Sequence, residues 1–488
     1  MTGIAPGGAE PTDLSHVPVR DFNLRSAFAL AFSDVSPIVG IYSVFGIGLV
    51  AAGPAFFWAF PVVLLGQLAV TGVFGDLVSR WPFQGSVYAW ARELFGARFG
   101  WFTNWAYSWG LTIAMASVAL AAAQFLGPAL GLNNLNQTET SLLGVGVLLF
   151  GTIANMIGSK FLKGLLYISM TAELISSIGI GVTLLIFHRM HSFSILFSGA
   201  GTGHGAGWLT GAFLVVIAYV GFSFVGFESA GSIAEEVQEA RRVLPKAITL
   251  SLLAAGLLVM LATLGLLLAV PDLGAVLSGK DTNPIATTLE AHLGSAMGRI
   301  LLVMLTIGFT ASGIAVQAAV SRAIWASARV RELPAAWFLS KLSGPERLPR
   351  NVIGVTFVIS SIVLFIHNPK VFTLLISAST AGFFLSYAMP VVGAAITRLM
   401  GRWTPGPVSM GRIGTAVTYL AAIWIVAETV NIAWPRNAYG VWYLNWGIVL
   451  ATVVLGVIGG AVSAWVFRRD GAALSSPLTP AIVDAEGE

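Results

Sequence analysis

Three acidic residues stand out because each lies in an otherwise apolar stretch: Asp34, Glu173 and Glu228. Ionising a carboxyl group in apolar surroundings is unfavourable, so such a group can take a proton from one side of a membrane and lose it to the other. The structural alternative is a protonated or paired acid that cross-links helices. We interpret all three as candidates for proton coupling or gating. Asp34 would pair with an inner-gate cation, Glu173 would couple protons or bind a cation, and Glu228 would gate, bind an amine or carry a proton.

The chain lacks the motifs that support covalent chemistry. No phosphate-binding loop, nucleophile elbow or HExxH motif occurs, and there is no cysteine. His188, Arg189 and His191 lie close together, but a metal site would need more ligands on a fixed scaffold, so we expect solvated loop residues. We therefore predict no enzyme activity, no cofactor and no metal site. The net charge of +4 is not gathered in a basic run, which argues against a nucleic-acid partner.

Two of the apolar stretches are interrupted by residues that weaken a helix. The stretch from Phe32 to Ser43 contains Pro37, which donates no backbone hydrogen bond, and Gly40, which tolerates unusual conformations. The stretch from Tyr219 to Gly231 contains three glycines, two serines and a glutamate. One interpretation is a proline kink in the first stretch and close helix packing in the second. The other is a pair of breaks at membrane depth, whose open backbone lines a cavity.

These residues belong to a strongly hydrophobic chain. Of its 488 residues, 56% are hydrophobic and 10% are charged, whereas soluble domains carry roughly 25% charged residues. A membrane-spanning helix needs about 20 apolar residues. The pattern therefore predicts an all-α membrane protein with twelve transmembrane helices, at residues 26–52, 54–78, 100–127, 140–161, 162–187, 208–234, 245–270, 298–330, 352–368, 371–397, 414–433 and 443–467.

The distribution of basic residues predicts the orientation. With the N-terminus inside, 21 of the 26 Lys and Arg residues fall on the inner side of these spans and 5 on the outer side. Residues 1–25 lack a secretory signal and are expected to form a cytoplasmic tail. Residues 468–488 are small, polar and acidic, and are expected to form a disordered cytoplasmic tail. We predict a multi-pass protein of the cell (inner) membrane with both termini in the cytoplasm.

The two interrupted spans are the first and the sixth. Because they are five spans apart, the sixth starts from the opposite side of the membrane, as an inverted five-plus-five repeat requires. Such a repeat places two discontinuous helices beside one site at the membrane midplane. We predict a first repeat over 26–187, a second over 208–397 and two peripheral helices over 414–467.

Three segments of the chain resemble the amino acid–polyamine–organocation superfamily. Asp76–Trp90 is similar to the first inner loop of that superfamily, Ala234–Ile248 to the signature after helix 6, and Ser321–Pro334 to the end of helix 8 and the following loop. The matches occur in order and extend over roughly residues 20 to 470. Within the superfamily the chain looks most like the amino acid/choline transporter branch, which includes γ-aminobutyrate permeases.

The resemblance implies a LeuT-type fold and a substrate surrounded by the two breaks. By similarity an aromatic residue at Phe222 would cover the substrate, and helix 3 would contribute further contacts. One departure is that Gly40 is followed by Ile41 and Tyr42, whereas many relatives have Gly-x-Gly there to hold a substrate carboxylate. Gln317 could bind the substrate or only join helices. The candidate substrate-binding residues are Ser36, Pro37, Ile38, Val39, Gly40, Ile41, Tyr107, Ser108, Thr112, Phe222, Ser223, Phe224, Gly226 and Gln317.

The sequence thus predicts a secondary active transporter that moves a small amino acid, a γ-aminobutyrate-like acid or an amine by alternating access. Its partners would be that small molecule, protons and the lipid bilayer. Proton-coupled symport is the favoured mode, and exchange of amino acids, polyamines or choline is the alternative. A channel would more often show an oligomeric pore or a filter sequence, and a sensor without transport is a third alternative.

Overall fold

The computed structural model describes residues 18–132, 135–366, 371–436 and 442–469, and every regular element within them is a helix. Eleven helices of this part are long and apolar enough to cross a membrane, and α15 (Arg350–Leu364) is a shorter apolar helix. The predicted all-α membrane fold is confirmed, while the count of twelve spans and the inverted repeat stay predictions. Most of the predicted tails, 1–25 and 468–488, lies outside the described residues.

Most spans follow the predicted ranges to within a few residues. Two differ: the sixth ends earlier than 234, and the eighth begins well before 298. In chain order the spans are Leu24–Ala52 (α1 and α2), Pro54–Arg80 (η2 and α3), Ala97–Ala129 (α5), Gln137–Ile157 (α6), Ser159–Phe187 (α7), Gly205–Phe224 (α8, η4, α9 and η5), Ala240–Ala269 (α11), Pro284–Arg329 (α13), Ser377–Leu399 (in α16, Val371–Leu399), Gly411–Ala433 (η7 and α17) and Gly447–Arg469 (α19).

The first span is broken at Ser36, between α1 (Leu24–Val35) and α2 (Pro37–Ala52). Ser36 has a positive φ of 43°, which turns the chain out of the helix. Its hydroxyl accepts the backbone N–H of Val39 at 3.3 Å and so caps α2. Pro37 is the first residue of α2, where its missing N–H costs nothing. The predicted interruption of the first span is therefore confirmed.

The sixth span is broken just after η5 (Gly221–Phe224). Val225 is extended, Gly226 has a φ of 98°, and a short helix, α10 (Ser229–Ser232), resumes beyond them. Only glycine adopts such a φ without steric cost, so Gly226 allows the chain to turn here. This second predicted interruption is also confirmed, and it explains why the span ends before residue 234.

The eighth span is extended because α13 continues through a kink. Asn283 caps its start by accepting the N–H of Ala286 at 3.4 Å, and Pro284 is its first residue. Gly294 then has φ 76° and ψ 166°, so the helix axis changes direction there. The part before Gly294 forms one wall of a cavity described below.

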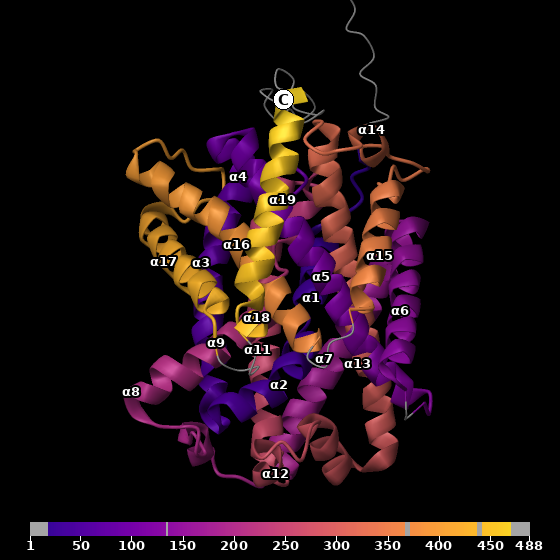
Figure 1. The fold of residues 1–488 in the computed structure, drawn as a ribbon, viewed down its shortest axis with the longest axis vertical. Helices are drawn as coiled ribbons and strands as arrows, with labels where there is room; N and C mark the ends of the chain where they lie inside the picture. The colour runs from indigo at the N-terminus through magenta and orange to yellow at the C-terminus, as the bar shows by residue number, and fades with distance from the viewer. Residues whose placement is uncertain (1–17, 133–134, 367–370, 437–441, 470–488) are drawn as a thin grey trace, which may run out of the picture.

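The broken helices occupy the middle of the bundle (Figure 1). α1 packs against α7, α10, α11 and α13, and α2 packs against α9 (Leu214–Val220), α11, α13 and η5. The apolar window of Leu24–Ala52 is 72% buried, against 28% for Gly411–Ala433 and 11% for α19, so these last two spans are peripheral. One end of the bundle carries α4 (Val87–Phe95), α14 (Ala336–Leu339) and the last turn of α19, and we call it the basic end. α8 and α12 (Leu273–Leu277) lie at the opposite end (Figure 1).

Candidate functional site

The two breaks lie side by side. Oγ of Ser223 donates a hydrogen bond of 2.9 Å to the backbone oxygen of Gly40. A Cβ atom added to Gly40 would lie 3.1 Å from Cβ of Ser223, so glycine is what allows this approach. Phe222, next to Ser223, packs with Ile38, Val39 and Phe309 in a small apolar cluster. The candidate residues of α2 and η5 are therefore brought together.

Glu228 is buried beside the second break and is held by two tyrosines. Oη of Tyr107 donates a 2.8 Å hydrogen bond to Oε1 of Glu228, and Oη of Tyr387 hydrogen-bonds to its Oε2. The Tyr387 hydroxyl also accepts the backbone N–H of Gly226 at 3.0 Å. Oγ of Ser86 donates to the backbone oxygen of Glu228 at 2.9 Å. Elements from three spans and one loop thus fix this carboxyl group at the break.

Asp34 lies on the last turn of α1, against the second break. A Cβ atom on Gly226 would lie 2.6 Å from Oδ1 of Asp34, so the carboxyl group and the glycine are in direct contact. The Glu228 carboxyl and the Ser229 hydroxyl also lie near Asp34. In the described part of the chain, Oδ2 of Asp34 and Oγ of Ser229 are buried and make no hydrogen bond. Two carboxyl groups and unused polar atoms therefore gather where the helices open.

Glu173 lies on α7 and contacts the first break from the other side. Oγ of Ser36 donates to its Oε2 at 2.9 Å, and Oγ of Ser169 donates to its Oε1 at 3.1 Å. The backbone N–H of Ile38, in the first turn of α2, is a further donor. The carboxyl group is fully buried. Glu173 thus occupies the positive N-terminal end of α2, where a negative charge is favoured.

Several candidate residues lie away from the breaks or face other neighbours. Oγ1 of Thr112 donates to the backbone oxygen of Ser108 at 2.6 Å, and Ser360 on α15 donates to the oxygen of Thr112 at 3.0 Å. Phe224 packs edge-on against Phe60 of α3. The contacts of Ser360 and Phe60 join helices, whereas the Thr112 hydroxyl bonds within α5. Gln317 also joins helices, because its amide group hydrogen-bonds to Thr152, Asn155 and the backbone of Ile353.

A network of ion pairs closes the bundle between the breaks and the basic end. Arg322 of α13 binds Glu236 through Nε at 3.0 Å and Nη2 at 3.3 Å, and Gln84 donates to the same carboxyl group at 2.6 Å. Arg329 binds Glu235 with N–O distances of 2.7 and 2.5 Å. Arg322 is 1% exposed and Glu236 is 7% exposed, so water reaches this contact poorly.

A second buried pair reinforces this closure. Nε of Arg92 on α4 lies 2.8 Å from Oε1 of Glu332, and Tyr88 donates to Oε2 at 2.8 Å. Burial raises the pKa of Glu332, and the charge of Arg92 opposes that rise. Trp101 donates to the backbone oxygen of Glu332 at 2.7 Å. Apart from Arg92 and Trp101, the residues of these two networks come from the three segments that carry the family resemblance, although sequence analysis did not assign them a role.

The opposite end of the bundle has a cavity between its helices. A cavity of about 220 Å³ lies between α2, α5 and the kinked start of α13. Tyr42, Gln124, Phe125, Asn283 and Glu290 are among its lining residues. The Tyr42 hydroxyl is buried and has no hydrogen-bond partner within the described residues. The bundle is therefore asymmetric, with ion pairs at one end and a partly polar cavity at the other.

Sequence comparisons with known proteins identify the family of this chain. Residues 22–458 match the amino acid permease family. The amino-acid permease BAT1 of Arabidopsis thaliana is 23% identical over 92% of this chain and 91% of its own. The thiamine transporter thi9 of Schizosaccharomyces pombe is 24% identical over 92% of this chain and 84% of its own. The polyamine transporter TPO5 of Saccharomyces cerevisiae is 21% identical over 90% of this chain and 74% of its own. The chain therefore belongs to the amino acid permease family of the amino acid–polyamine–organocation superfamily, and it is a multi-pass membrane transporter.

Proposed function

We propose that this transporter carries a small substrate with a protonated amino group, such as an amino acid or an amine, and binds it where the first and sixth spans are broken. The observation that carries the proposal is the contact of Asp34, Gly226 and Glu228 at the point where Ser223 ties the two breaks together. Two carboxyl groups in one buried place favour a cationic partner, because their mutual repulsion is relieved when a positive charge lies between them.

The first turn of α2 also favours a cationic group over a carboxylate. Free N–H groups at a helix start are what would bind a substrate carboxylate. Here the N–H of Val39 is bonded to Ser36, and the N–H of Ile38 faces Glu173. This agrees with the missing second glycine after Gly40. Two relatives, the thiamine transporter thi9 and the polyamine transporter TPO5, also support an amine.

Transport would proceed by alternating access. The ion pairs of Arg322 with Glu236 and of Arg92 with Glu332 would form the closed inner gate, and the cavity beside Tyr42 would lead to the site from the other side. Opening requires the ion pairs to separate. Substrate binding at Asp34 and Glu228 favours this only if the substrate binds the open state more tightly than the closed state. The basic end would face the cytoplasm of the cell membrane, as the distribution of Lys and Arg predicts.

Coupling to protons would use the buried acids. When ionised, the Glu228 carboxylate only accepts hydrogen bonds from its two tyrosine partners. When protonated, it has an O–H group that can donate a hydrogen bond. Glu173 is similarly placed on the first break, where its hydroxyl partner Ser36 caps α2. We favour symport with protons, in which protonation of one acid accompanies substrate binding at the other acids.

Uptake into proteoliposomes tests this proposal. The purified chain is reconstituted, and the accumulation of radiolabelled amino acids, γ-aminobutyrate, putrescine and choline is measured with and without an inward acid gradient. Accumulation of an amine or amino acid driven by the gradient is the expected result. Brisk counterflow without gradient-driven accumulation would instead identify an exchanger. The proposal would be overturned if no compound moved although a thermal unfolding assay showed the protein to be folded. Ion currents above carrier rates would instead indicate a channel.

A further inference from the structure

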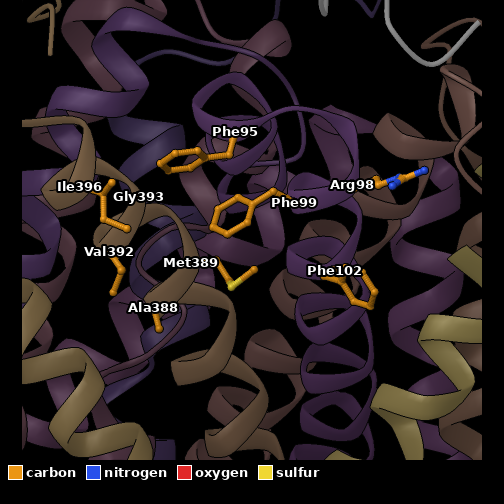
Figure 2. A pocket seen from close by; sticks show the side chains of 9 residues that line it. All are labelled: Phe95, Arg98, Phe99, Phe102, Ala388, Met389, Val392, Gly393 and Ile396. Atoms are coloured by element: carbon orange, nitrogen blue, oxygen red, sulfur yellow. The ribbon is translucent and has the colours of Figure 1, made fainter. Parts of the chain in front are cut away.

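An apolar groove of about 570 Å³ opens on the side of the bundle near the basic end (Figure 2). Phe95, at the end of α4, and Phe99 and Phe102, on the first turns of α5, line one wall. Met389, Val392 and Ile396 of α16 line the other wall. Phe95, Phe102 and Ile396 are each more than a third exposed, so the groove is open along its length. Its size is in the range of small-molecule binding sites.

The groove arises from the way α5 and α16 cross. The helices come into close contact at Gly110 and Gly382, where a Cβ atom on Gly382 would lie 2.6 Å from Cα of Gly110. The groove residues lie on the first turns of α5 and the last turns of α16, away from this crossing point and towards the basic end. Beyond this contact a space is left between the two helices, and it has room for part of another molecule.

Basic side chains lie at one edge of the groove. Arg98 lines it, is exposed and points away from the aromatic wall (Figure 2). Its guanidinium lies 5.5 Å from the ring centroid of Phe467 on α19. The next two residues of α19, Arg468 and Arg469, are exposed as well. The apolar slot therefore ends at Arg98, and we call Arg98 together with the two arginines that follow Phe467 in the chain, Arg468 and Arg469, the Arg98 cluster.

We propose that this groove binds one anionic phospholipid, with an acyl chain between α5 and α16 and its phosphate on the Arg98 cluster. A groove with only apolar walls would accept the chain of any lipid. The Arg98 cluster adds a preference for net negative head groups, because basic pockets between membrane helices at the cytoplasmic side attract them. Arginine suits this role, since its planar guanidinium binds phosphate through two parallel hydrogen bonds.

The occupied groove lies directly behind the candidate site. Met389 follows two residues after Tyr387, which holds Glu228 and Gly226 from the inner side of α16. Tyr107, the other partner of Glu228, is on α5. An acyl chain between the ends of these helices therefore acts on the spacing of α5 and α16, the two helices that carry Tyr107 and Tyr387. The lipid acts on the spacing of the helices and needs no contact with substrate.

Native mass spectrometry of the full chain tests the lipid site without any substrate. Delipidated protein is titrated with dioleoyl-phosphatidylglycerol and, separately, with dioleoyl-phosphatidylcholine. The wild type should bind the first phosphatidylglycerol more tightly than phosphatidylcholine. Arg98→Gln should weaken the binding of phosphatidylglycerol about fivefold, the effect of one basic group near an anionic head group, and leave phosphatidylcholine unchanged. Val392→Trp, which fills the groove, should weaken both lipids.

Arg241→Gln is the matched control, because Arg241 is also an exposed arginine and belongs to the first turn of α11, outside the groove. It should leave the affinity for both lipids unchanged. Equal affinities for the two lipids in the wild type, or an equal loss in the Arg98 and Arg241 variants, would overturn the proposal. So would a dimer held through the groove that excludes phosphatidylglycerol. Because lipid binding is measured directly, its failure would not touch the proposed transport function.

Discussion

Oγ of Ser36, the residue that separates α1 from α2, lies 2.9 Å from Oε2 of Glu173 on α7. The same hydroxyl caps α2 by accepting the N–H of Val39. A carboxylate can accept from Ser36, Ser169 and Ile38 together, whereas a protonated acid loses one acceptor position and gains a donor. A change in the protonation of Glu173 therefore acts directly on the residue at which the first span is broken.

Glu173→Gln should remove the pH dependence of transport and preserve the fold. Glutamine keeps the size of the side chain and one acceptor for Ser36, but it cannot take up or release a proton. Uptake driven by an acid gradient should fall to the level reached without a gradient, while counterflow continues. The measurement is initial uptake in proteoliposomes across a range of pH.

Glu428→Gln is the control for this change. Glu428 is also a buried acid, 3% exposed, but it lies on the peripheral helix α17 and accepts from Asn431 at 3.0 Å. The Glu428 variant should retain the pH profile of the wild type. An unchanged profile in the Glu173 variant would mean that Glu173 is only a structural link between α7 and the first break.

Asp34→Asn should weaken the binding of substrates that carry an ammonium group. A hydrogen bond to a charged group contributes about 1.5–3 kcal/mol, so the Kd should rise by roughly tenfold to more than a hundredfold. The effect should be confined to cationic ligands, because the amide can still accept a hydrogen bond but no longer carries the charge. Isothermal titration calorimetry with an amine and its uncharged isostere separates the two contributions. Equal losses for both ligands would contradict a role for the charge of Asp34.

Gly226→Ala should block binding and leave membrane insertion intact. The φ of 98° disfavours any residue with a Cβ atom, at a cost of about 1–2 kcal/mol. The added atom would also lie 2.6 Å from Oδ1 of Asp34. Thermal stabilisation of the detergent-solubilised protein by substrate should be lost, and the amount of protein in the membrane should be unchanged.

Gly211→Ala is the matched control, because it changes a glycine of the same span with no atom within 4 Å of the added Cβ. This variant should bind substrate like the wild type. If the Gly226 variant binds equally well, the second break is not part of the substrate site.

The spans and both breaks could be predicted because they depend on local residue types. A run of apolar residues specifies a membrane helix, and Pro37 and Gly226 weaken a helix wherever they occur. The start of α13 at Pro284 could not be predicted. Its first turns contain polar residues that are also typical of a loop, and Gly294 is a residue that normally ends a helix. Tyr387 was also missed. It is a single tyrosine in an apolar span, and only the packing of α16 against α5 turns it towards Glu228.

The inner ion pairs could not be assigned from the sequence for a related reason. Arg322 and Glu236 are separated by 86 residues, and Arg92 and Glu332 by 240. Many acidic and basic residues occur in the same loops, so residue types alone do not choose the partners. Pairing depends on where α4, α13 and the loop after α10 come to lie, which is a property of the folded bundle.

Arg322→Gln should open the proposed inner gate. Removal of Arg322 leaves the Glu236 carboxylate as a buried charge with only the neutral amide of Gln84 as a partner, at a cost of about 3–5 kcal/mol to the closed state. The chain has no cysteine, so Ser321→Cys, at a fully buried position on α13, serves as the only thiol. Its labelling by a maleimide should be much faster in the Arg322→Gln background than in the parent. The double change Arg322→Gln and Glu236→Gln removes both charges and should return the labelling rate towards that of the parent. Lys246→Gln, at an exposed site on α11, should leave the labelling rate of the parent unchanged. Labelling that stays slow with Arg322 replaced would show that other contacts hold this end closed.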